Sequence, residues 1–403
     1  MMRSTSSRAE TLESGACLRT RCLAAACAAL AVAVTPLACA HEPDPAAGPE
    51  AERSVELPEA SAGDAGDASA DAGPCSASHV CVAHAPISEY INITSVWGSS
   101  KTDVWAVGTN ATVLHYDGNT WESAGRTDPD ASLYTLRSVW LDRPDDVWIV
   151  DGHRLRHSTG WKGPTATEWT FYELPLDDVT PAAIGGKNNL VWLARGAMGP
   201  GSGAPLLKLG AWADEGPSSL DEVGPYWTYS LVALAVSGPD EVWATGFNAL
   251  NSEPGRVVRA RLVTEDEDGG ASEPSWQVEE HDSRSTRLLH GIWADESVVW
   301  LAGEGGTLRR MTRSAVQTKM FDVVESPVTT DLYGMFGFGP NDVWAVGEAS
   351  TVLHWDGATW SKLATPFDGA ADKPRLLAVW GSSPGDVWIA GHGTMLHFTE
   401  NAP

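Results

Sequence analysis

A short phrase built around tryptophan recurs along most of the chain and constrains the fold more than any other feature. Asp-Val-Trp-Ala-Val-Gly ends at Gly108 and again at Gly347, and close variants end at Val150 and Gly391. The second tryptophan of each repeat unit falls at Trp105, Trp148, Trp192, Trp243, Trp300, Trp344 and Trp388. The steps between them are 43, 44, 51, 57, 44 and 44 residues. Self-similarity at such a period indicates a repeat architecture, here of seven units, two of which carry insertions.

Each unit is predicted to contain four short strands. In the best-preserved unit, apolar and aromatic runs alternate with Gly, Pro, Asn and Asp, which favour turns. Its expected strands are Leu332–Phe336, Asp342–Gly347, Thr351–Trp355 and Thr359–Leu363. Four-stranded units of about 44 residues are typical of propeller blades. The chain has 19 Trp, and we expect the repeated ones to pack between neighbouring blades.

The two ends of the repeat region are complementary. The last unit holds only three expected strands, the third being Thr394–Thr399, whereas Val80–His84 precedes the first complete unit and has no blade of its own. Pairing this segment beside the C-terminal strands would complete the last blade and remove an open edge. The sequence therefore predicts an all-β fold, a seven-bladed β-propeller of four-stranded blades closed by an N-terminal strand.

The first 78 residues differ in composition from the repeats. Two arginines precede an apolar run from Leu23 to Ala38, whose length is typical of a signal peptide. Cys39 would be acylated if this is a lipoprotein signal, although Ala38-Cys39-Ala40 also fits ordinary signal peptidase. Residues 40–78 lack aromatic residues and are rich in Ala, Gly, Pro and Asp, which predicts a disordered tether. The expected domains are a signal peptide (1–39), an acidic tether (40–78) and the propeller (79–403).

These features predict an extracytoplasmic protein of the cell envelope. Lipidation at Cys39 would anchor it to the outer or cytoplasmic membrane, and ordinary cleavage would leave it periplasmic or secreted. In an exported protein the pair Cys75 and Cys81 is expected to form a disulfide. The chain has 53 acidic and 27 basic side chains, a net charge of −26. Such a chain repels phosphate backbones, which excludes nucleic acid as a partner.

The repeats resemble the Asp-Val-Trp-Ala-Val-Gly repeats of exported bacterial propellers, in the broad group that contains BNR/Asp-box and WD-like folds. Segments 115–121 and 354–360 are similar to Asp-boxes, but Asp117 and Asp356 lack the spacing and the preceding Ser or Thr of that motif. We expect them to act as hairpin devices. The resemblance implies a fold and not a function, because propellers host enzymes, lectins and scaffolds.

The repeated histidines and aspartates favour a structural role. His115, His354 and His397 occupy the same third-strand position in different blades, so they cannot converge on one metal ion. The aspartates that precede Val-Trp, such as Asp103 and Asp342, are expected to bond their own turn backbone. We predict no metal site and no cofactor.

Departures from the repeat identify the first candidate binding surface. Blades 3 and 4 have longer loops between their second and third strands, at 196–205 and 247–255, on the face that also carries the connections between blades. The aromatic and polar residues Tyr226, Trp227, Phe247 and Asn248 lie there. Loops on a rigid scaffold often carry binding residues, although a tolerated surface insertion explains the same pattern.

The mouth of the central channel is the second candidate. Arg137, Arg287 and Arg375 fall at or near the start of innermost strands, and His290 and Tyr333 lie within two others. Converging arginines would suit a carboxylate or another anion, whereas salt bridges with surface acids are the alternative in so acidic a chain.

The predicted activity is recognition of an envelope protein or glycan, by a monomer, through the loop-bearing face. The alternative is a glycoside hydrolase or lyase that acts on polysaccharide at the central channel. Such an enzyme needs converging carboxylates, or a carboxylate with His or Tyr. The innermost strands carry few carboxylates, so we assign no catalytic residue.

Overall fold

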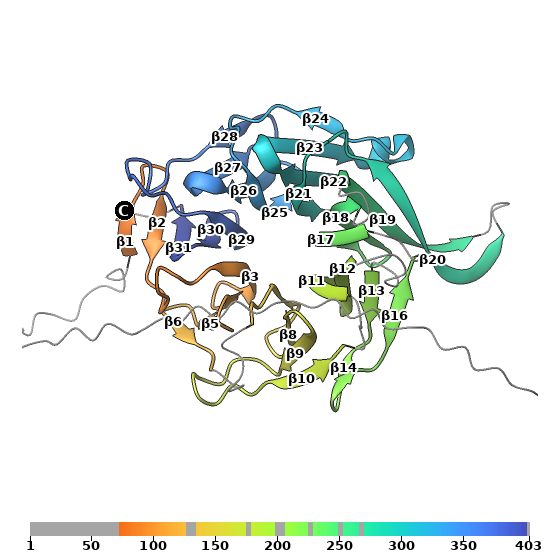
Figure 1. Ribbon diagram of the computed structural model, residues 1–403, viewed down its shortest axis with the longest axis horizontal. Helices are drawn as coiled ribbons and strands as arrows, with labels where there is room; N and C mark the ends of the chain where they lie inside the picture. The colour runs from red at the N-terminus through yellow and green to blue at the C-terminus, as the bar shows by residue number, and fades with distance from the viewer. Residues whose placement is uncertain are drawn as a thin grey trace, which may run out of the picture. The chain divides into compact units, whose positions relative to one another are not determined.

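The computed structural model describes residues 72–125, 134–174, 179–197, 206–224, 229–248, 253–265 and 270–400. These residues form seven antiparallel sheets arranged around a common axis (Figure 1). In six of these sheets the first strand in the chain is innermost and the following strands lie progressively further from the axis, whereas the seventh also takes its outermost strands from the N-terminal side of the repeats. The structure confirms the predicted seven-bladed β-propeller.

Six blades come from consecutive segments of the chain. Blade 1 contains β3 (Ile93–Ser100), β4 (Asp103–Gly108), β5 (Val113–Tyr116) and β6 (Trp121–Ser123). Blade 2 contains β7 (Ser138–Leu141), β8 (Val147–Val150), β9 (Arg154–Ser158) and β10 (Thr170–Glu173). Blade 3 contains β11 (Val179–Lys187), β12 (Leu190–Ala197), β13 (Leu206–Leu209) and β16 (Leu220–Val223), with a separate hairpin of β14 (Trp212–Ala213) and β15 (Gly216–Pro217).

The later blades follow the same plan. Blade 4 contains β17 (Tyr229–Gly238), β18 (Glu241–Asn248), β19 (Glu253–Glu265) and β20 (Ala271–Asp282). Blade 5 contains β21 (Leu289–Ala294), β22 (Val298–Gly303), β23 (Thr307–Thr312) and β24 (Asp322–Val324). Blade 6 contains β25 (Leu332–Gly339), β26 (Asp342–Gly347), β27 (Thr351–Trp355) and β28 (Trp360–Lys362). Short 3-10 helices η2 (Glu304–Gly306), η3 (Arg313–Thr318) and η4 (Glu348–Ser350) connect strands of blades 5 and 6.

Blade 7 joins the two ends of the repeat region, as predicted. Its inner strands are β29 (Leu376–Ser383), β30 (Asp386–Gly391) and β31 (Thr394–Thr399), and β2 (Val80–Ala83) is the fourth. Val80 lies opposite Phe398 and Val82 opposite Leu396. Figure 1 shows the orange N-terminal strands beside the blue C-terminal ones. Because Val80 is fully buried, this closure also completes part of the core.

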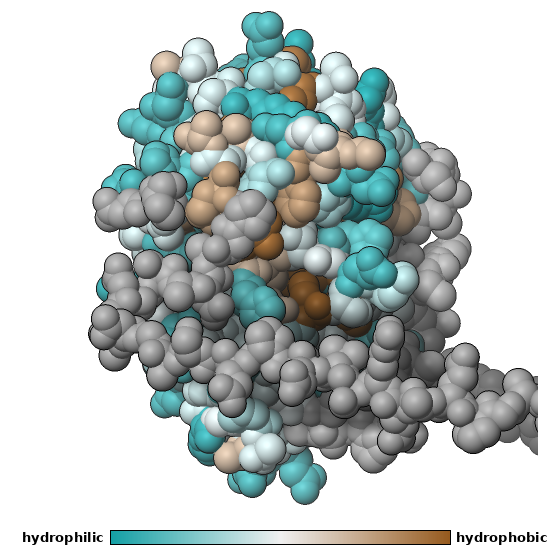
Figure 2. Space-filling view, turned by 90° about the vertical axis from the view of Figure 1, so that its left-hand side faces the viewer, coloured by the Kyte–Doolittle hydropathy of each residue, from teal (hydrophilic) through white to brown (hydrophobic). Residues whose placement is uncertain are grey.

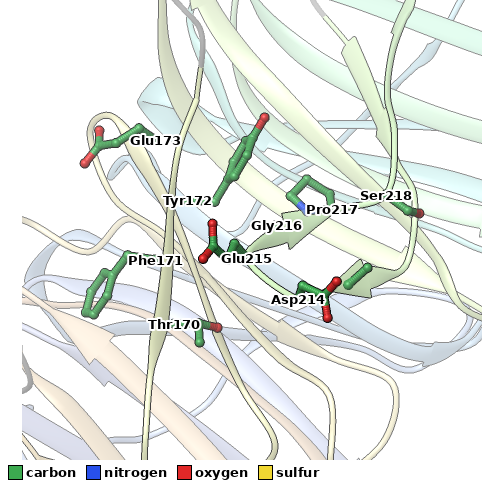
Figure 3. A pocket seen from close by; sticks show the side chains of 10 residues that line it. Thr170, Phe171, Tyr172, Glu173, Asp214, Glu215, Gly216, Pro217 and Ser218 are labelled. Atoms are coloured by element: carbon green, nitrogen blue, oxygen red, sulfur yellow. The ribbon is translucent and has the colours of Figure 1, made fainter.

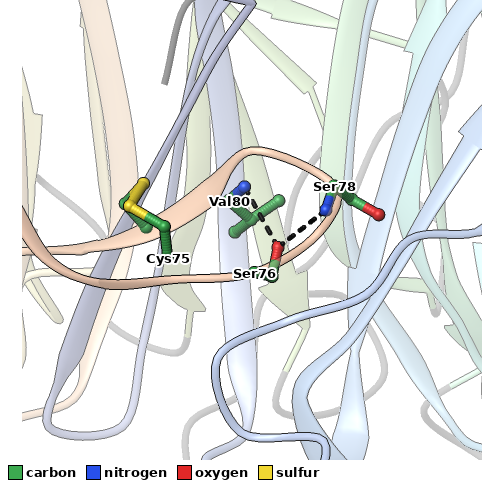
Figure 4. Close-up of a disulfide and its surroundings, with 5 residues drawn as sticks. Cys75, Ser76, Ser78 and Val80 are labelled. Carbon is green, nitrogen blue, oxygen red and sulfur yellow. Dashed lines mark hydrogen bonds between the residues drawn. A yellow bond between two sulfur atoms is a disulfide. The ribbon is translucent and has the colours of Figure 1, made fainter. Parts of the chain in front are cut away.

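A fifth strand, β1 (Ala72–Cys75), extends blade 7 outward by pairing with β2. It lies upstream of residue 79, the expected start of the propeller. A disulfide joins Cys75 to Cys81 across this pair (Figure 4). In the turn between the strands, the Ser76 hydroxyl accepts hydrogen bonds from the amides of Ser78 and Val80. The disulfide and this turn therefore hold β1 on the closing strand.

The repeated tryptophans fill the spaces between blades, as predicted. All seven are at most 2% exposed. Trp105 of blade 1 packs with Val139 and Ile149 of blade 2, and Trp344 of blade 6 packs with Leu376 of blade 7. Burying a large aromatic side chain contributes several kcal/mol, so this contact helps to fix each blade against the next.

A hydrogen-bonded trio of Asp, Trp and His secures the repeated tryptophan in blades 1, 2 and 6, whereas blade 7 keeps only the Asp–His pair and the Trp388 indole nitrogen has no partner among the described residues. In blade 6, Asp342 accepts hydrogen bonds from the indole of Trp344 at 3.1 Å and from Nε2 of His354 at 2.8 Å. Corresponding Asp–His pairs are Asp103–His115, Asp146–His157 and Asp386–His397. The expectation that these aspartates bond their own turn backbone is wrong. Antiparallel pairing places the third-strand histidine directly opposite Trp, within reach of the acid.

The hairpin devices anticipated at Asp117 and Asp356 are present. Each carboxylate accepts hydrogen bonds from two backbone amides of its own turn, at 2.8–2.9 Å. The glycines that follow, Gly118 and Gly357, have φ values of 99° and 96°, a region that favours glycine. The amide hydrogen bonds lower the pKa of both carboxyl groups.

The surface is mainly polar where it can be seen on the side of β1 and β2. Figure 2 shows hydrophilic residues over much of that side, with small groups of hydrophobic ones between them. Within the described ranges, no helix has the length and apolarity needed to span a bilayer.

Candidate functional site

One face of the propeller collects the loops between second and third strands together with the connections that lead into each innermost strand. Backbone hydrogen bonds join these two kinds of segment in four blades, namely Thr109 to Asn92, Glu304 to Leu288, Glu348 to Asp331 and His392 to Arg375. We call this surface the loop face. It surrounds the mouth of the central channel, because the innermost strands begin there.

The first predicted surface can be traced only in part. Tyr226, Trp227 and most of the extended loops of blades 3 and 4 lie outside the described residues. Phe247 and Asn248 are half-buried at the end of β18, where Asn248 pairs with Tyr229 of β17. These two positions therefore border the loop face, as expected from their place in the repeat.

Beside Asn248 lies a polar cluster that sequence analysis missed. The Tyr229 hydroxyl donates a hydrogen bond to Glu280 at 2.6 Å, and Arg256 forms ion pairs with Glu253 and with Glu280. Burial and the hydrogen bond to Glu280 raise the pKa of Tyr229 to about 12. The partners are as many as 51 residues apart in sequence, and only the pairing of four long strands brings them together.

The second predicted surface is a compact cluster over blades 5, 6 and 7. Glu348 accepts a hydrogen bond from Tyr333 at 3.1 Å and another from Nε of Arg375 at 2.7 Å. The Arg375 guanidinium lies 5.2 Å from the centre of the Tyr333 ring. The ring centre of His290 also lies 5.2 Å from that of Tyr333. We call these four residues and Arg287 the mouth cluster.

Arg287 is exposed, as is Arg375. Its guanidinium lies over the backbone of Gly305 in η2, so closely that a Cβ on this glycine would be 1.5 Å from Nη1. Gly305 has a φ of 62°, and its amide donates to Asp331 at 2.7 Å. Among the described residues, the Arg287 guanidinium has no hydrogen-bond or ion-pair partner. Its positive charge is therefore available to a ligand.

The three predicted arginines do not form a single anion site. Arg375 is paired with Glu348, in line with the alternative of a surface salt bridge. Arg137 is exposed just before β7, on blade 2, and Arg287 belongs to blade 5. No hydrogen bond or ring contact joins the three guanidinium groups in the described ranges. Arg375 is thus combined with the Tyr333 ring, Arg287 lies against Gly305, and Arg137 stands separately.

The protonation states in the mouth cluster argue against a tyrosinate nucleophile. Burial raises the pKa of Tyr333, and the hydrogen bond to Glu348 reinforces this against the opposing charge of Arg375. Burial lowers the pKa of His290, against the charges of Glu304 and Asp331. Near neutral pH, Tyr333 is therefore a phenol and His290 an uncharged imidazole. A tyrosinate nucleophile would require the opposite shift.

The histidines of the repeat belong to separate blades, as expected. His115, His354 and His397 each bond the aspartate of their own blade. His157 occupies the same position and was overlooked, although its spacing from Trp148 equals that of His397 from Trp388. In the part of the chain that the structure describes, no group of three or more His, Cys, Asp or Glu side chains could hold a metal ion.

Several solved structures have a similar fold. A structure of YCF48 bound to a D1 peptide covers 82% of this chain and 100% of its own, with a TM-score of 0.60 and 19% identity. YCF48 from Cyanidioschyzon merolae covers 80% of this chain and 99% of its own, with a TM-score of 0.58 and 17% identity. The WD40 β-propeller domain of Doa1 covers 80% and 96%, with a TM-score of 0.52 and 11% identity.

Sequence comparison adds no relative. No protein-family profile and no curated protein matches the chain. Identities of 11–19% to the solved structures establish a shared architecture. The chain is a β-propeller similar in fold to YCF48 and to WD40 domains.

Proposed function

We propose that this propeller is a binding scaffold that recognises a protein partner through the loop face, at the mouth cluster. The observation that carries the proposal is the exposed Arg375 guanidinium over the half-buried ring of Tyr333, which His290 also contacts. The exposed guanidinium of Arg287, which has no hydrogen-bond or ion-pair partner among the described residues, adds a free positive charge on the same face. Arg and Tyr are the residue types that most often dominate protein interfaces, because both combine a broad apolar surface with directed hydrogen bonds.

The rigid surroundings of these side chains support a preformed site. Arg375 and Tyr333 share the Glu348 carboxylate, and Gly305 leaves room for the guanidinium of Arg287. A partner would then find the side chains already positioned, which lowers the entropic cost of binding. A propeller of similar fold, YCF48, has been solved with a bound peptide, which makes a peptide segment a reasonable ligand class.

The cellular setting is part of the proposal. We infer export by the N-terminal signal, acylation at Cys39, and presentation of the propeller on its tether at a membrane of the envelope. A glycan partner remains the alternative within recognition. A polysaccharide hydrolase or lyase is the second candidate function, because Glu348, Tyr333 and His290 do meet at the channel mouth.

The proposal can be tested with the full chain and a display library of random linear peptides. Selected peptides are measured by calorimetry against wild type, Arg287→Glu, Tyr333→Ala and the control Lys362→Glu, which changes an exposed residue of β28. We expect the two cluster substitutions to weaken binding by about tenfold or more and the control to have no effect. Equal binding by all four proteins would overturn the proposal.

A panel of envelope oligosaccharides separates the alternatives. Thermal stabilisation that disappears in Arg287→Glu would replace the protein partner by a glycan. Product release from a polysaccharide that is lost in Tyr333→Phe would establish the enzyme.

A further inference from the structure

Blade 3 differs from the other blades by the β14–β15 hairpin, which reaches across to blade 2. Trp212 of the hairpin stacks on His157, with ring centres 4.7 Å apart and planes inclined by 10°. Gly216 lies against Tyr172 of β10, where a Cβ would be 2.3 Å from the ring. The hairpin is thus fixed against the neighbouring blade on both of its strands.

A pocket of about 690 Å³ lies between this hairpin and β10, lined by residues 170–173 and 213–218. Figure 3 shows Thr170 and Tyr172 on the side of β10 toward the hairpin, with Phe171 and Glu173 on the other side. We call this pocket the rim groove. It lies at the outer edge of the propeller, on strands that do not contribute to the mouth cluster.

The wall of the rim groove formed by β10 is an open sheet edge. β10 is the last strand of blade 2 and pairs only with β9. No described backbone group bonds its outer edge. Such an edge is a template for another strand, and addition of an extended peptide to it is a common mode of recognition.

Blade 7 shows that this architecture accepts a fifth strand. There, β1 pairs with the fourth strand, β2, and lies outermost in the sheet. The position that β1 occupies in blade 7 corresponds to the open edge of β10 in blade 2. A strand added at β10 would therefore repeat a geometry that the molecule already contains.

The charge of the rim groove indicates which strand would be favoured. Glu173, Asp214 and Glu215 are exposed at its border. Asp214 and Glu215 have no ion-pair or hydrogen-bond partner among the described side chains, and Glu173 lies 3.7 Å from Arg154. An extended segment with basic side chains complements this border. The acidic residues 40–71 of the chain itself carry the wrong charge.

We propose that the rim groove is a second docking site, which binds an extended, basic segment of a partner protein as a fifth strand on blade 2. The added strand would take its main-chain hydrogen bonds from the edge of β10. Its Lys or Arg side chains would approach Asp214 and Glu215, and an apolar side chain would cover the Tyr172 ring. This site is independent of the mouth cluster.

The test uses the full chain and three fluorescent octapeptides, one alternating lysine with valine, one glutamate with valine and one lysine with proline. We expect anisotropy to show binding of the lysine–valine peptide only, since proline lacks the amide that strand pairing requires. The double variant Asp214→Asn/Glu215→Gln should bind about tenfold more weakly. The control Asp240→Asn/Glu273→Gln, which removes the same charge from other exposed positions, should bind as wild type does.

Hydrogen exchange locates the bound peptide. The amides of residues 170–173 should become protected in wild type and stay protected in Arg287→Glu, whose rim groove is intact. Equal weakening in the two double variants would mean non-specific attraction to an acidic surface and would overturn the proposal. So would binding of the lysine–proline peptide, or binding without protection of β10.

Discussion

Blades 6 and 4 bond the indole of the repeated tryptophan with different acidic side chains. In blade 6 the acid before the repeated tryptophan is Asp342, and its partners, Trp344 and His354, belong to the same blade. In blade 4 the acid is Glu241, which bonds Trp243 at 2.9 Å, Arg259 at 2.5 Å and Arg313 at 2.6 Å. Arg313 belongs to η3 of blade 5.

The difference shows how a local network becomes a contact between blades. The residue opposite the repeated tryptophan is His in blades 1, 2, 6 and 7, Lys in blade 3 and Arg in blades 4 and 5. The longer Glu241 side chain accepts hydrogen bonds from Arg259 of its own blade and from Arg313 of the next blade. Blade 5 has Arg310, but Val298 stands where blade 4 has Glu241, and the indole nitrogen of Trp300 has no partner among the described residues.

Removing the blade 4 acid should have the largest effect. Glu241→Gln leaves Arg313 and Arg259 facing a neutral amide in a site where the carboxylate is only 8% exposed. Breaking a buried ion pair on one side typically costs 3–5 kcal/mol, so we expect a loss of about 3 kcal/mol or more in the free energy of unfolding. Urea denaturation measures this, and a loss below about 1 kcal/mol would show that the bridge between blades adds little.

Acidification should remove the stabilisation by Glu241 in the wild-type protein. Burial raises the pKa of Glu241, but hydrogen bonds from Arg313, Ser237 and Trp243 and the charge of Arg259 lower it to about 2. Because the folded pKa lies below the unfolded value, its stabilisation is complete above about pH 4.5 and is lost as the pH falls toward 2. The difference is on the order of 3 kcal/mol.

Titration of stability checks this directly. The free energy of unfolding, followed between pH 6 and pH 2, should fall more steeply in wild type than in Glu241→Gln. If the free energy of unfolding fell equally steeply in both proteins, the lowered pKa of Glu241 would be wrong. The pKa of Glu279 is also lowered to about 2. Its protonation should therefore still make the variant less stable as the pH falls, although less steeply than wild type.

The blade 6 network should contribute less, because Asp342 bonds Trp344 and His354 of its own blade. Asp342→Ala leaves the indole of Trp344 and the His354 ring without their acceptor, and we expect a loss of about 2 kcal/mol. A double-mutant cycle with His354→Ala isolates the interaction. A coupling energy near zero would mean that the aspartate acts on the turn alone.

Adding an acid to blade 5 should have the smallest effect. Val298 occupies the position of Glu241, and Arg310 lies directly opposite Trp300. Val298→Glu would give both the guanidinium and the indole nitrogen a partner, so we expect a change within about 1 kcal/mol despite the buried charge. Val299→Glu, one residue along the same strand, is the matched control and should unfold the protein. Similar losses in both would refute the analogy with blade 4.

Some parts of this structure could be predicted well. The strands expected at Asp342–Gly347, Thr351–Trp355 and Thr394–Thr399 agree with β26, β27 and β31, since period and turn residues act over short distances. The role of Asp342 was misjudged, because its partner comes from the next strand. Glu348 went unnoticed, although it holds Tyr333 and Arg375 together, since nothing in its own repeat distinguishes it.

The rim groove was also invisible in the sequence. Trp212 reads as one more tryptophan of the repeat, yet it stacks on a histidine of the preceding blade, 55 residues earlier. The spacing of the repeated tryptophans and turn residues along the chain specifies how long each blade is and where its turns fall. It does not specify which faces of a hairpin meet the neighbouring sheet.

By itself, the sequence determined the number of blades, their strand order and the closure by the segment Val80–His84, because tryptophan spacing, turn residues and hydrophobic alternation are local physical signals. The tertiary structure alone decided which side chains of different blades meet, such as Glu348 with Arg375 and Glu241 with Arg313. Contacts of that kind depend on the rotation of one sheet against the next, which packing of the whole ring sets.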